Sequence, residues 1–375
     1  MARRAPSSRQ AGATAAVASQ TRSDSLKRTL KIIAINVCIT LALVAILGLA
    51  GEWYLRTYAP LSDHRGLFRL THDPACYAMI PNSDLVKQGV RITTNSDGYR
   101  DREFVDPSSS GKFVIAVLGD SYTFAQGVPQ DATYPAVMER ILNQHAGKDY
   151  FRVWNLGVSG YNAEQESYIL RTFVLPRRPA WVVMGYNIND YEPVNIPPTG
   201  PPGHIQESPE QLKRQKNFLD IDLLVIHFVK HRLGDLIRKV RPGWYHSSYV
   251  SDVKKAYLDP HGPWQKVAET LKSMNQLCKA EGIGFTVVLL PAMFDFTPYE
   301  FAVVHATVYE FCKKNGIDVL DVAPFFKGMR AQHLHVSLMD PHPNAAAQRI
   351  FAQAIAEHLL KVITPAGSAE KRPDQ

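Results

Sequence analysis

Four short polar blocks hold the residues of this 375-residue sequence that could perform chemistry. Three of them directly follow apolar runs, and the fourth precedes the last helical pattern. The blocks are Gly119-Asp120-Ser121, the stretch that ends at Gly160, the stretch that ends at Asn189-Asp190, and Asp340-Pro341-His342. A serine hydroxyl is a weak nucleophile that an adjacent histidine can activate, and an aspartate can orient that histidine. These residue types therefore predict nucleophilic catalysis by a serine.

Each residue can be assigned a role in that chemistry. We expect Ser121 to be the nucleophile and His342 the base, with Asp340 orienting the imidazole and stabilising its charged form. The backbone N–H groups of Ser121 and Gly160 and the side-chain amide of Asn189 are available to stabilise the oxyanion of a tetrahedral intermediate. Ser121 and His342 lie far apart in the sequence, so only the fold can bring them together.

Each block also has a plainer interpretation when it stands alone. A Gly-Asp-Ser stretch after a strand is more often a helix cap or a ligand loop. Asn189-Asp190 could form a turn, and a single histidine before a helix is usually a surface residue. The joint occurrence of the four blocks at three strand ends and one helix start is what favours a catalytic site.

Other candidate sites rank lower. Ser159 lies in a stretch that approaches the Gly-x-Ser-x-Gly motif of another hydrolase fold, but Tyr161 occupies the place of the last glycine. His333 and His335 could suggest a metal site, yet carboxylate or thiolate ligands at metal-binding spacing are absent from the sequence around them. The sequence also has no Gly-x-x-x-x-Gly-Lys phosphate loop.

The apolar runs before the polar blocks predict a parallel sheet. Continuous apolar runs are typical of strands that are buried on both faces. We expect strands at 113–118, 152–156, 181–185, 285–290 and 319–322, and helices at 134–144, 164–173, 264–281, 300–315 and 345–362. Strands separated by helices predict a three-layer α/β domain with a five-stranded parallel sheet. Ligands bind at the carboxyl ends of the strands in such a sheet, which is where the polar blocks lie.

The four blocks, in this order, resemble those of the SGNH, or GDSL-type, serine hydrolases. The resemblance covers roughly residues 95–362, and residues 95–103 and 119–128 are similar to family members that are anchored by one N-terminal helix. It implies a flavodoxin-like sheet, a Ser-His-Asp triad and a three-donor oxyanion hole. It also implies esterase activity on acyl or acetyl groups, without a metal or an organic cofactor.

The sequence departs from the family pattern at two places. The commonest pattern has two residues between the aspartate and the histidine, whereas only Pro341 separates Asp340 from His342. A one-residue spacing resembles that of polysaccharide O-acetyltransferase relatives, although their blocks follow a different order. The resemblance therefore supports Asp340 less firmly than His342, and some members use a Ser-His dyad. Gln126 stands where many relatives have glycine, and we expect it not to affect the chemistry.

The composition excludes several other classes of protein. The net charge of +7 could suggest nucleic-acid binding, but residues 1–31 hold seven of the 42 basic residues and one of the 35 acidic ones. The remaining 344 residues thus carry 35 basic and 34 acidic groups and are nearly neutral. A hydrophobic content of 45% excludes disorder of the whole chain, and four cysteines are too few for a disulfide scaffold. We expect Cys278 and Cys312, on helices that could be neighbours, to be buried free thiols rather than a disulfide.

Residues 32–51 predict one membrane segment. This run of 20 residues contains no charged side chain and would span about 30 Å as a helix, which is the thickness of a bilayer core. A cleaved signal peptide is the alternative, since Gly48-Leu49-Ala50 could be a cleavage site, but its hydrophobic region is usually shorter. The basic residues before the run predict a cytoplasmic N-terminus. All that follows is expected on the extracytoplasmic, periplasmic side of the cytoplasmic membrane.

This organisation divides the chain into five parts. We expect a disordered basic leader at 1–31, a signal anchor at 32–51, a membrane-proximal lead-in segment at 52–111, the hydrolase domain at 112–363 and a disordered tail at 364–375. The domain contains a Pro-rich insertion at 193–259 between the third and fourth strands. Such a long insertion is expected to be a lid or a binding element, and an extra packed helix is an equal alternative.

The leading hypothesis is a membrane-anchored extracytoplasmic serine esterase. Its partners would be an ester substrate, either an acylated glycan or a lipid, and the membrane, without nucleic acid. One alternative is an O-acyltransferase that acts on a cell-envelope polysaccharide, with a sugar hydroxyl replacing water. The other is a catalytically retired scaffold of envelope assembly, against which the intact Ser121, Gly160, Asn189 and His342 count.

Overall fold

The computed structural model describes residues 8–58, 66–194, 225–226, 229, 248–337 and 340–363. The chain forms two compact units, Met1–Tyr58 with Asp222–Lys230 and Ala59–Ile221 with His231–Gln375. The first unit holds helix α1, and the second holds the sheet and the helices that cover it. Most of the predicted insertion at 193–259 and the tail at 364–375 lie outside the described residues.

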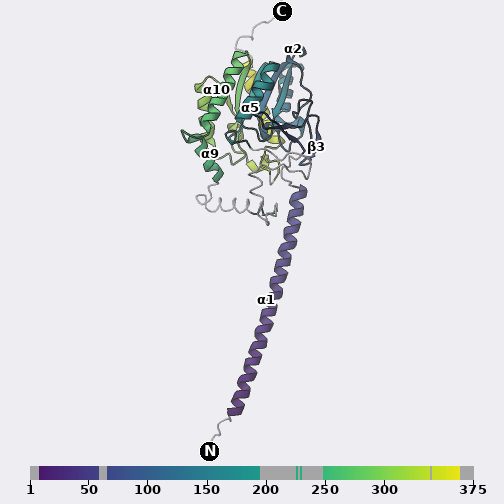
Figure 1. The fold of residues 1–375 in the computed structure, drawn as a ribbon, viewed down its shortest axis with the longest axis vertical. Helices are drawn as coiled ribbons and strands as arrows, with labels where there is room; N and C mark the ends of the chain where they lie inside the picture. Colours follow the sequence, from purple (N-terminus) through teal and green to yellow (C-terminus); the bar gives the residue numbers. More distant parts are fainter. Residues whose placement is uncertain are drawn as a thin grey trace, which may run out of the picture. The chain divides into compact units, whose positions relative to one another are not determined.

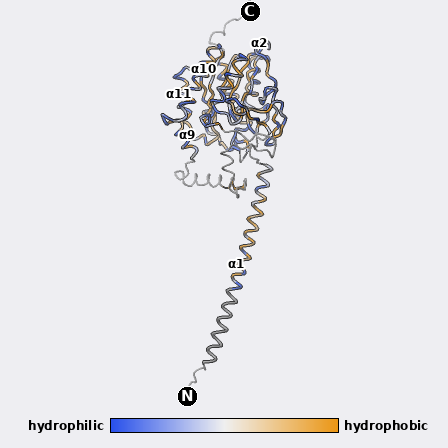
Figure 2. The backbone as a smooth tube through the Cα atoms, viewed as in Figure 1, coloured by the Kyte–Doolittle hydropathy of each residue, from blue (hydrophilic) through white to orange (hydrophobic). Residues whose placement is uncertain are grey.

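Helix α1 (Ser8–Tyr58) contains the predicted apolar run, which appears as an orange stretch in Figure 2. Its segment Lys27–Leu55 has a mean hydropathy of 2.7 and is long and apolar enough to cross a membrane or to act as a signal sequence. The helix begins at Ser8, so it includes most of the leader for which composition predicts disorder. A helix that the apolar run has already nucleated extends at little cost into an alanine-rich segment, because alanine is the strongest helix former.

The five predicted strands form one parallel sheet in the second unit (Figure 1). They are β5 (Phe113–Gly119), β6 (Phe151–Gly157), β7 (Trp181–Tyr186), β8 (Gly284–Leu289) and β9 (Asp318–Asp321). The spatial order is β6-β5-β7-β8-β9, and every neighbouring pair is parallel. The register aligns Gly119 of β5 with Gly157 of β6 and Gly185 of β7, so three strand ends lie level at one edge. The predicted fold class is confirmed.

Alternate residues of the strands face two separate hydrophobic cores, as the period of two in a strand requires. Val114, Ala116 and Leu118 of β5 belong to one core, whereas Ile115 and Val117 belong to the other. The first core is covered by α5 (Ala163–Ile169), α9 (Ser248–Leu258), α10 (Trp264–Ala280) and α11 (Ala302–Lys314). The second core is covered by α4 (Tyr134–Ala146) and α12 (Ala345–Ile363). The sheet is therefore the middle of three layers.

Short elements complete the second unit. They are α2 (Pro107–Ser110), α3 (Ser121–Phe124), η1 (Gln130–Ala132), η2 (Leu170–Val174), α6 (Leu175–Arg177), η3 (Ala323–Phe326) and η4 (Ala331–Leu334). The helix predicted at 164–173 is thus α5 followed by the π-helical η2 and by α6. Pro176 lacks the N–H that a continuous α-helix would need near this point.

Two antiparallel hairpins precede the sheet and were not predicted. The first pairs β1 (Phe68–Leu70) with β2 (Tyr77–Met79), and the second pairs β3 (Asp84–Lys87) with β4 (Val90–Thr93). Several of their apolar side chains are buried in the same core as one face of β5: Phe68, Tyr77, Met79 and Ile92. The described part of the lead-in segment therefore shares its core with the hydrolase fold.

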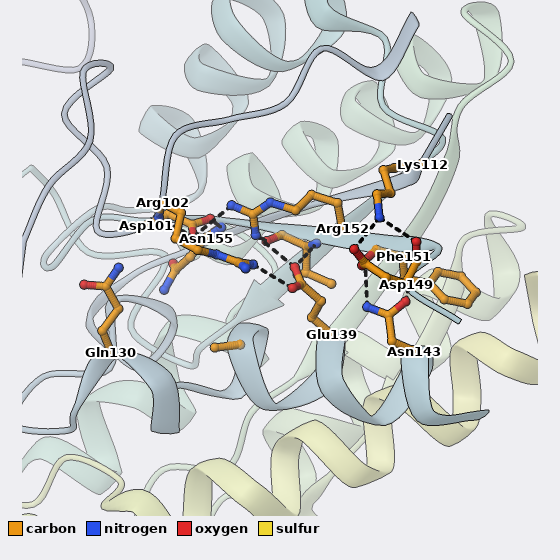
Figure 3. Close-up of polar contacts among 12 residues, drawn as sticks. Asp101, Arg102, Lys112, Gln130, Glu139, Asn143, Asp149, Phe151, Arg152 and Asn155 are labelled. Carbon is orange, nitrogen blue, oxygen red and sulfur yellow. Dashed lines mark hydrogen bonds and ion pairs between the residues drawn. The ribbon is translucent and has the colours of Figure 1, made fainter. Parts of the chain in front are cut away.

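Side chains cover the free edge of β6, the outermost strand of the sheet (Figure 3). The backbone N–H groups of Phe151, Val153 and Asn155 donate to Asn143, Glu139 and Asp101 at 2.7, 2.8 and 2.9 Å. Arg152, which is 7% exposed, forms ion pairs with Glu139 at 2.9 Å and with Asp101 at 3.2 Å. These contacts satisfy edge groups that would otherwise be open to another strand, and Asp101 ties the lead-in segment to the sheet.

Candidate active site

Strand β5 delivers Ser121 to the start of a short helix. Gly119 ends the strand, and the Asp120 carboxylate caps α3 by accepting a hydrogen bond from the Tyr122 N–H at 2.8 Å. Ser121 is the first residue of α3 and is 8% exposed. Its backbone N–H is among those that a helix leaves without an intrahelical partner.

Three residues that the sequence analysis assigned to the triad lie in one hydrogen-bonded row. His342 Nε2 is 2.9 Å from Ser121 Oγ, and His342 Nδ1 is 2.5 Å from Asp340 Oδ1. The His342 backbone N–H donates to the same Asp340 oxygen at 3.0 Å. The ring thus places Nδ1 at the carboxylate and Nε2 at the serine hydroxyl, which is the arrangement of a base that an acid orients. The ring of Tyr122 packs against the imidazole at 5.8 Å between centroids.

The other oxygen of Asp340 accepts two side-chain amides. Gln88 Nε2 donates to Asp340 Oδ2 at 2.6 Å, and Gln126 Nε2 donates to the same oxygen at 3.2 Å. Burial of Asp340 would raise its pKa, but hydrogen bonds and the charge of His342, together with the Gln88 amide, hold this pKa below its usual range. Asp340 is therefore ionised throughout the physiological pH range.

The contact of Gln126 corrects one expectation. The sequence predicts that the residue in this position has no bearing on the chemistry, yet its amide reaches the carboxylate beside His342. Its side-chain oxygen also accepts a hydrogen bond from Ser159 Oγ at 3.4 Å. Glycine in this position could make neither contact.

Gly160 lies in a turn directly after β6. The Val158 N–H donates to the Gly119 carbonyl at 3.0 Å, which joins the end of β6 to the end of β5. Gly160 has a φ of 84°, a left-handed value that favours glycine, and it is exposed. Tyr77 of β2 fixes the neighbouring residue, because its hydroxyl donates to the Ser159 carbonyl at 3.0 Å.

Asn189 is held in a turn at the end of β7. The Asp190 carboxylate accepts the Asn187 N–H at 3.0 Å, and the Asp190 N–H donates back to the Asn187 carbonyl at 3.1 Å. Asn189 itself is half-buried, and its side chain lies near enough to Asp120 to favour the ionised form of that carboxyl. The predicted oxyanion donors thus come from the ends of β5, β6 and β7, which lie side by side.

Three carboxyl groups near these strand ends are buried and influence one another: Asp120, Glu166 and Asp190. Burial raises the pKa of Asp120, although the Tyr122 N–H and the charge of His342 oppose the rise. Burial raises the pKa of Glu166 and of Asp190 well above the usual range, and the charge of Asp120 adds to both. Within the described residues, neither carboxyl oxygen of Glu166 has a hydrogen-bond partner.

None of the lower-ranked candidates contacts Ser121 or His342 in the described part of the chain, although Ser159 is linked to Asp340 through Gln126. Ser159 is buried, and its hydroxyl donates to Gln126 rather than to a histidine. His335 Nε2 lies 2.9 Å from the Met293 carbonyl, and His333 is exposed. Among the residues that the structure describes, no group of three or more His, Cys, Asp or Glu side chains is arranged to hold a metal. Cys278 and Cys312 are buried and unbonded.

The sequence does not predict the contact of Gln88 with Asp340. The residue lies in the β3–β4 hairpin, outside the region in which catalytic blocks were sought. A two-residue loop with glycine between alternating strands is a hairpin signal, and Gln88-Gly89 between 84–87 and 90–93 fits it. That signal predicts the hairpin but not the hydrogen bond from Gln88 to Asp340, because the two residues lie 252 positions apart in the sequence.

A family model agrees with the order of the blocks. The model of the GDSL-like lipase/acylhydrolase family matches residues 117–350, which is more than half of the chain. The match begins inside β5 and ends inside α12, so it includes all four blocks. No curated protein matches the sequence.

Solved structures resemble the chain at low identity. TesA matches with a TM-score of 0.41 and 16% identity, over 66% of this chain and 97% of that one. A two-domain esterase active on acetylated mannans matches with a TM-score of 0.41 and 12% identity, over 70% of this chain and 52% of that one. An acetylxylan esterase from Geobacillus stearothermophilus matches with a TM-score of 0.39 and 16% identity, over 66% of this chain and 95% of that one.

Proposed function

Because this chain belongs to the GDSL-like lipase/acylhydrolase family, we propose that it is a serine esterase whose nucleophile is Ser121. One observation carries the proposal, namely the hydrogen-bonded row in which His342 Nε2 is 2.9 Å from Ser121 Oγ while Nδ1 is 2.5 Å from Asp340 Oδ1. A nucleophile, its base and an orienting carboxylate within hydrogen-bond reach of one another are the signature of an activated serine.

In the first half of the reaction, Ser121 Oγ attacks the carbonyl carbon of an ester. His342 Nε2 takes the hydroxyl proton, and the ionised Asp340 stabilises the imidazolium that forms. The N–H groups of Ser121 and Gly160 and the Asn189 amide stabilise the negative oxygen of the tetrahedral intermediate. The bond to the alcohol then breaks, His342 gives its proton to the leaving alkoxide, and the acyl group remains on Ser121.

In the second half, water replaces the alcohol. His342 removes one proton from the water as its oxygen attacks the acyl carbon, and the same donors stabilise the second oxyanion. The bond to Ser121 Oγ breaks, and the proton returns from His342 to the serine. The products are the alcohol and the carboxylic acid, and the enzyme is restored without a metal or an organic cofactor.

We also propose where this reaction takes place. The apolar segment of α1 would act as a single signal anchor, and the basic leader would keep the N-terminus in the cytoplasm. The hydrolase domain at 112–363 and the lead-in segment at 52–111 would then lie on the periplasmic side. Acetylated glycans or lipids of the cell envelope are the ester substrates that fit this location, with the insertion at 193–259 as lid or binding element.

Labelling of the full-length chain in detergent with a fluorophosphonate tests the proposal. We expect wild type to be labelled and to hydrolyse an aryl acetate, because the serine is activated by His342. Ser121→Ala should not be labelled and should lose about 10⁶-fold in kcat, as serine hydrolases do when the nucleophile is removed. Asp340→Asn should lose about 10⁴-fold if a triad operates and far less if Ser121 and His342 act as a dyad.

The outcomes separate the alternatives. Absence of labelling of wild type, or equal labelling of Ser121→Ala, would contradict an enzymatic role and favour a retired scaffold. Aryl acetate turnover that rises on addition of a glycan, with acetyl recovered on that glycan, would favour acyl transfer over hydrolysis.

A further inference from the structure

We propose that Gln88, at the tip of the β3–β4 hairpin, is a positioning residue that holds the Asp340 carboxylate in register with His342. The inference rests on the proposed roles of Ser121, His342 and Asp340. It assigns part of the active site to a segment that precedes the region matched by the family model at 117–350.

The hydrogen bonds of Asp340 carry the argument. Oδ1 accepts the His342 side chain and backbone N–H at 2.5 and 3.0 Å, and Oδ2 accepts Gln88 and Gln126 at 2.6 and 3.2 Å. Asp340 is 4% exposed, so water cannot readily replace these donors. Of the two amides, that of Gln88 makes the shorter contact, and a donor on Oδ2 fixes the plane of the carboxylate. Oδ1 is then held facing His342 Nδ1.

The backbone conformation of the hairpin tip does not by itself favour glutamine at position 88. Gln88 and Gly89 both have positive φ values, 50° and 73°, as the two central residues of such a loop require. Asparagine and glycine adopt this conformation more readily than glutamine, which tolerates it at some cost in free energy. Asparagine in place of Gln88 would therefore suit the turn better, but its shorter side chain could not span the same distance to Asp340.

The surroundings leave room for the Gln88 side chain and fix the hairpin. A Cβ added at Gly127 would lie 3.3 Å from Gln88 Oε1 and 2.3 Å from Val336 Cγ1, so glycine at this position allows close packing. Thr93 of β4 donates to the Gln130 side chain at 2.8 Å. The hairpin is thus attached to the loop that follows Ser121, and the position of its tip is coupled to the site.

An amide is suited to this task because it does not titrate. The ionisable groups that bear on the pair of Asp340 and His342 are Asp120, whose charge interacts with His342, and Tyr122, whose ring packs on the imidazole. A donor on Oδ2 offsets part of the negative charge that stabilises the imidazolium. Without the Gln88 donor, the Asp340 carboxylate is freer to rotate. In those molecules whose carboxylate still faces His342, the carboxylate keeps more of its negative charge and makes the imidazolium more stable.

Two variants of the full-length chain separate positioning from folding. Gln88→Asn keeps or improves the turn, but its side chain is too short to reach Asp340. Gln88→Met keeps the length of the side chain but lacks the N–H donor. For both, we expect kcat/KM for an aryl acetate and the rate of fluorophosphonate labelling to fall about 10- to 100-fold, by analogy with the loss seen when a group that orients the ligand of a catalytic metal is removed. KM should change little, and the acid limb of kcat/KM should move to higher pH. Tm of Gln88→Asn should stay close to that of wild type, because the more favourable turn offsets the lost hydrogen bond to the buried Asp340.

Val86→Ala is the matched control, since Val86 lies on β3 and is 69% exposed. It should retain the wild-type rate and pH profile. Wild-type kcat/KM and an unmoved acid limb in both Gln88 variants would overturn the inference, as would a loss of activity confined to variants with a lowered Tm. Activity of wild type that does not depend on Ser121 would instead contradict the proposed function, so the two failures are distinguishable.

Discussion

Glu166 is the residue whose burial has the clearest consequence for stability. It is 1% exposed, and its pKa is raised first by burial and then by the charges of Asp190 and Asp120. The folded protein therefore keeps the Glu166 proton at pH values where the unfolded chain has released it. Since the folded state then binds more protons than the unfolded state, the free energy of unfolding falls as pH rises above the usual glutamate pKa.

Glu166→Gln should remove the part of this pH dependence that Glu166 causes, while the raised pKa values of Asp190 and Asp120 leave the rest in place. A glutamine is as neutral as the protonated glutamate and has nearly the same shape. Between pH 5 and pH 8, we expect the free energy of unfolding of wild type to fall more steeply than that of the variant, by at most about 1.4 kcal/mol per pH unit for one proton. Unfolding by urea at several pH values measures the difference.

Glu164→Gln is the control, because Glu164 lies on the same helix and is exposed in an ion pair with Lys266. This variant should follow the wild-type curve closely, since an exposed pair contributes about 0–1 kcal/mol. Equal pH dependence in wild type and Glu166→Gln would mean that Glu166 is ionised in the folded protein at the pH where we expect it to be neutral.

At the scale of elements, the end of β6 determines how closely α3 packs on the sheet. A Cβ added at Gly157 would lie 2.3 Å from the Phe124 N and 2.5 Å from the Thr123 carbonyl carbon. Real Cβ atoms do not approach backbone so closely, and backbone cannot move aside as a flexible side chain can. Gly157 therefore allows the short helix that begins with Ser121 to lie against the strand ends.

Gly157→Ala should displace α3 and with it Ser121, the proposed nucleophile. We expect a loss of about 1–3 kcal/mol in the free energy of unfolding, which is typical of overpacking. We also expect the rate of fluorophosphonate labelling of the folded protein to fall. Gly147→Ala is the matched control: Gly147 has a φ of 64°, and its added Cβ would meet nothing within 4 Å. It should cost about 1 kcal/mol for the left-handed backbone and leave the labelling rate unchanged. Normal labelling of Gly157→Ala would show that α3 can shift without harm.

The same elements show which features a sequence reveals. The strands of the sheet could be predicted to within one residue at each end, because burial on both faces makes them continuous apolar runs. The hairpins of the lead-in segment have strands of three or four residues with mixed exposure, so their pattern is too short to be distinctive. Gln88 could not be connected with Asp340 from sequence, because a contact over such a separation depends on how the hairpin packs on the domain.

At the scale of the whole molecule, charge is divided sharply along the chain. The leader at 1–31 holds seven basic residues and one acidic residue, whereas the rest of the chain is close to neutral. The apolar segment Lys27–Leu55 begins within the last residues of this leader. Basic residues beside an apolar helix set its orientation during insertion, because they remain on the cytoplasmic side. Most of the net charge of +7 therefore lies beside the apolar segment, where it supports the proposed topology, and not on the second unit.

Neutralising the leader should therefore disturb orientation without affecting catalysis. We expect a tag at the C-terminus of the wild-type chain to be digested when protease is added to spheroplasts, because the proposed orientation would put the second unit outside the cytoplasm. Replacing the seven basic residues of the leader by glutamine should increase the protected fraction, whereas the same number of exposed basic residues replaced in the second unit should not. The purified leader variant should label with fluorophosphonate like wild type. Full protection of the wild-type tag would place the catalytic unit in the cytoplasm and would contradict an envelope substrate.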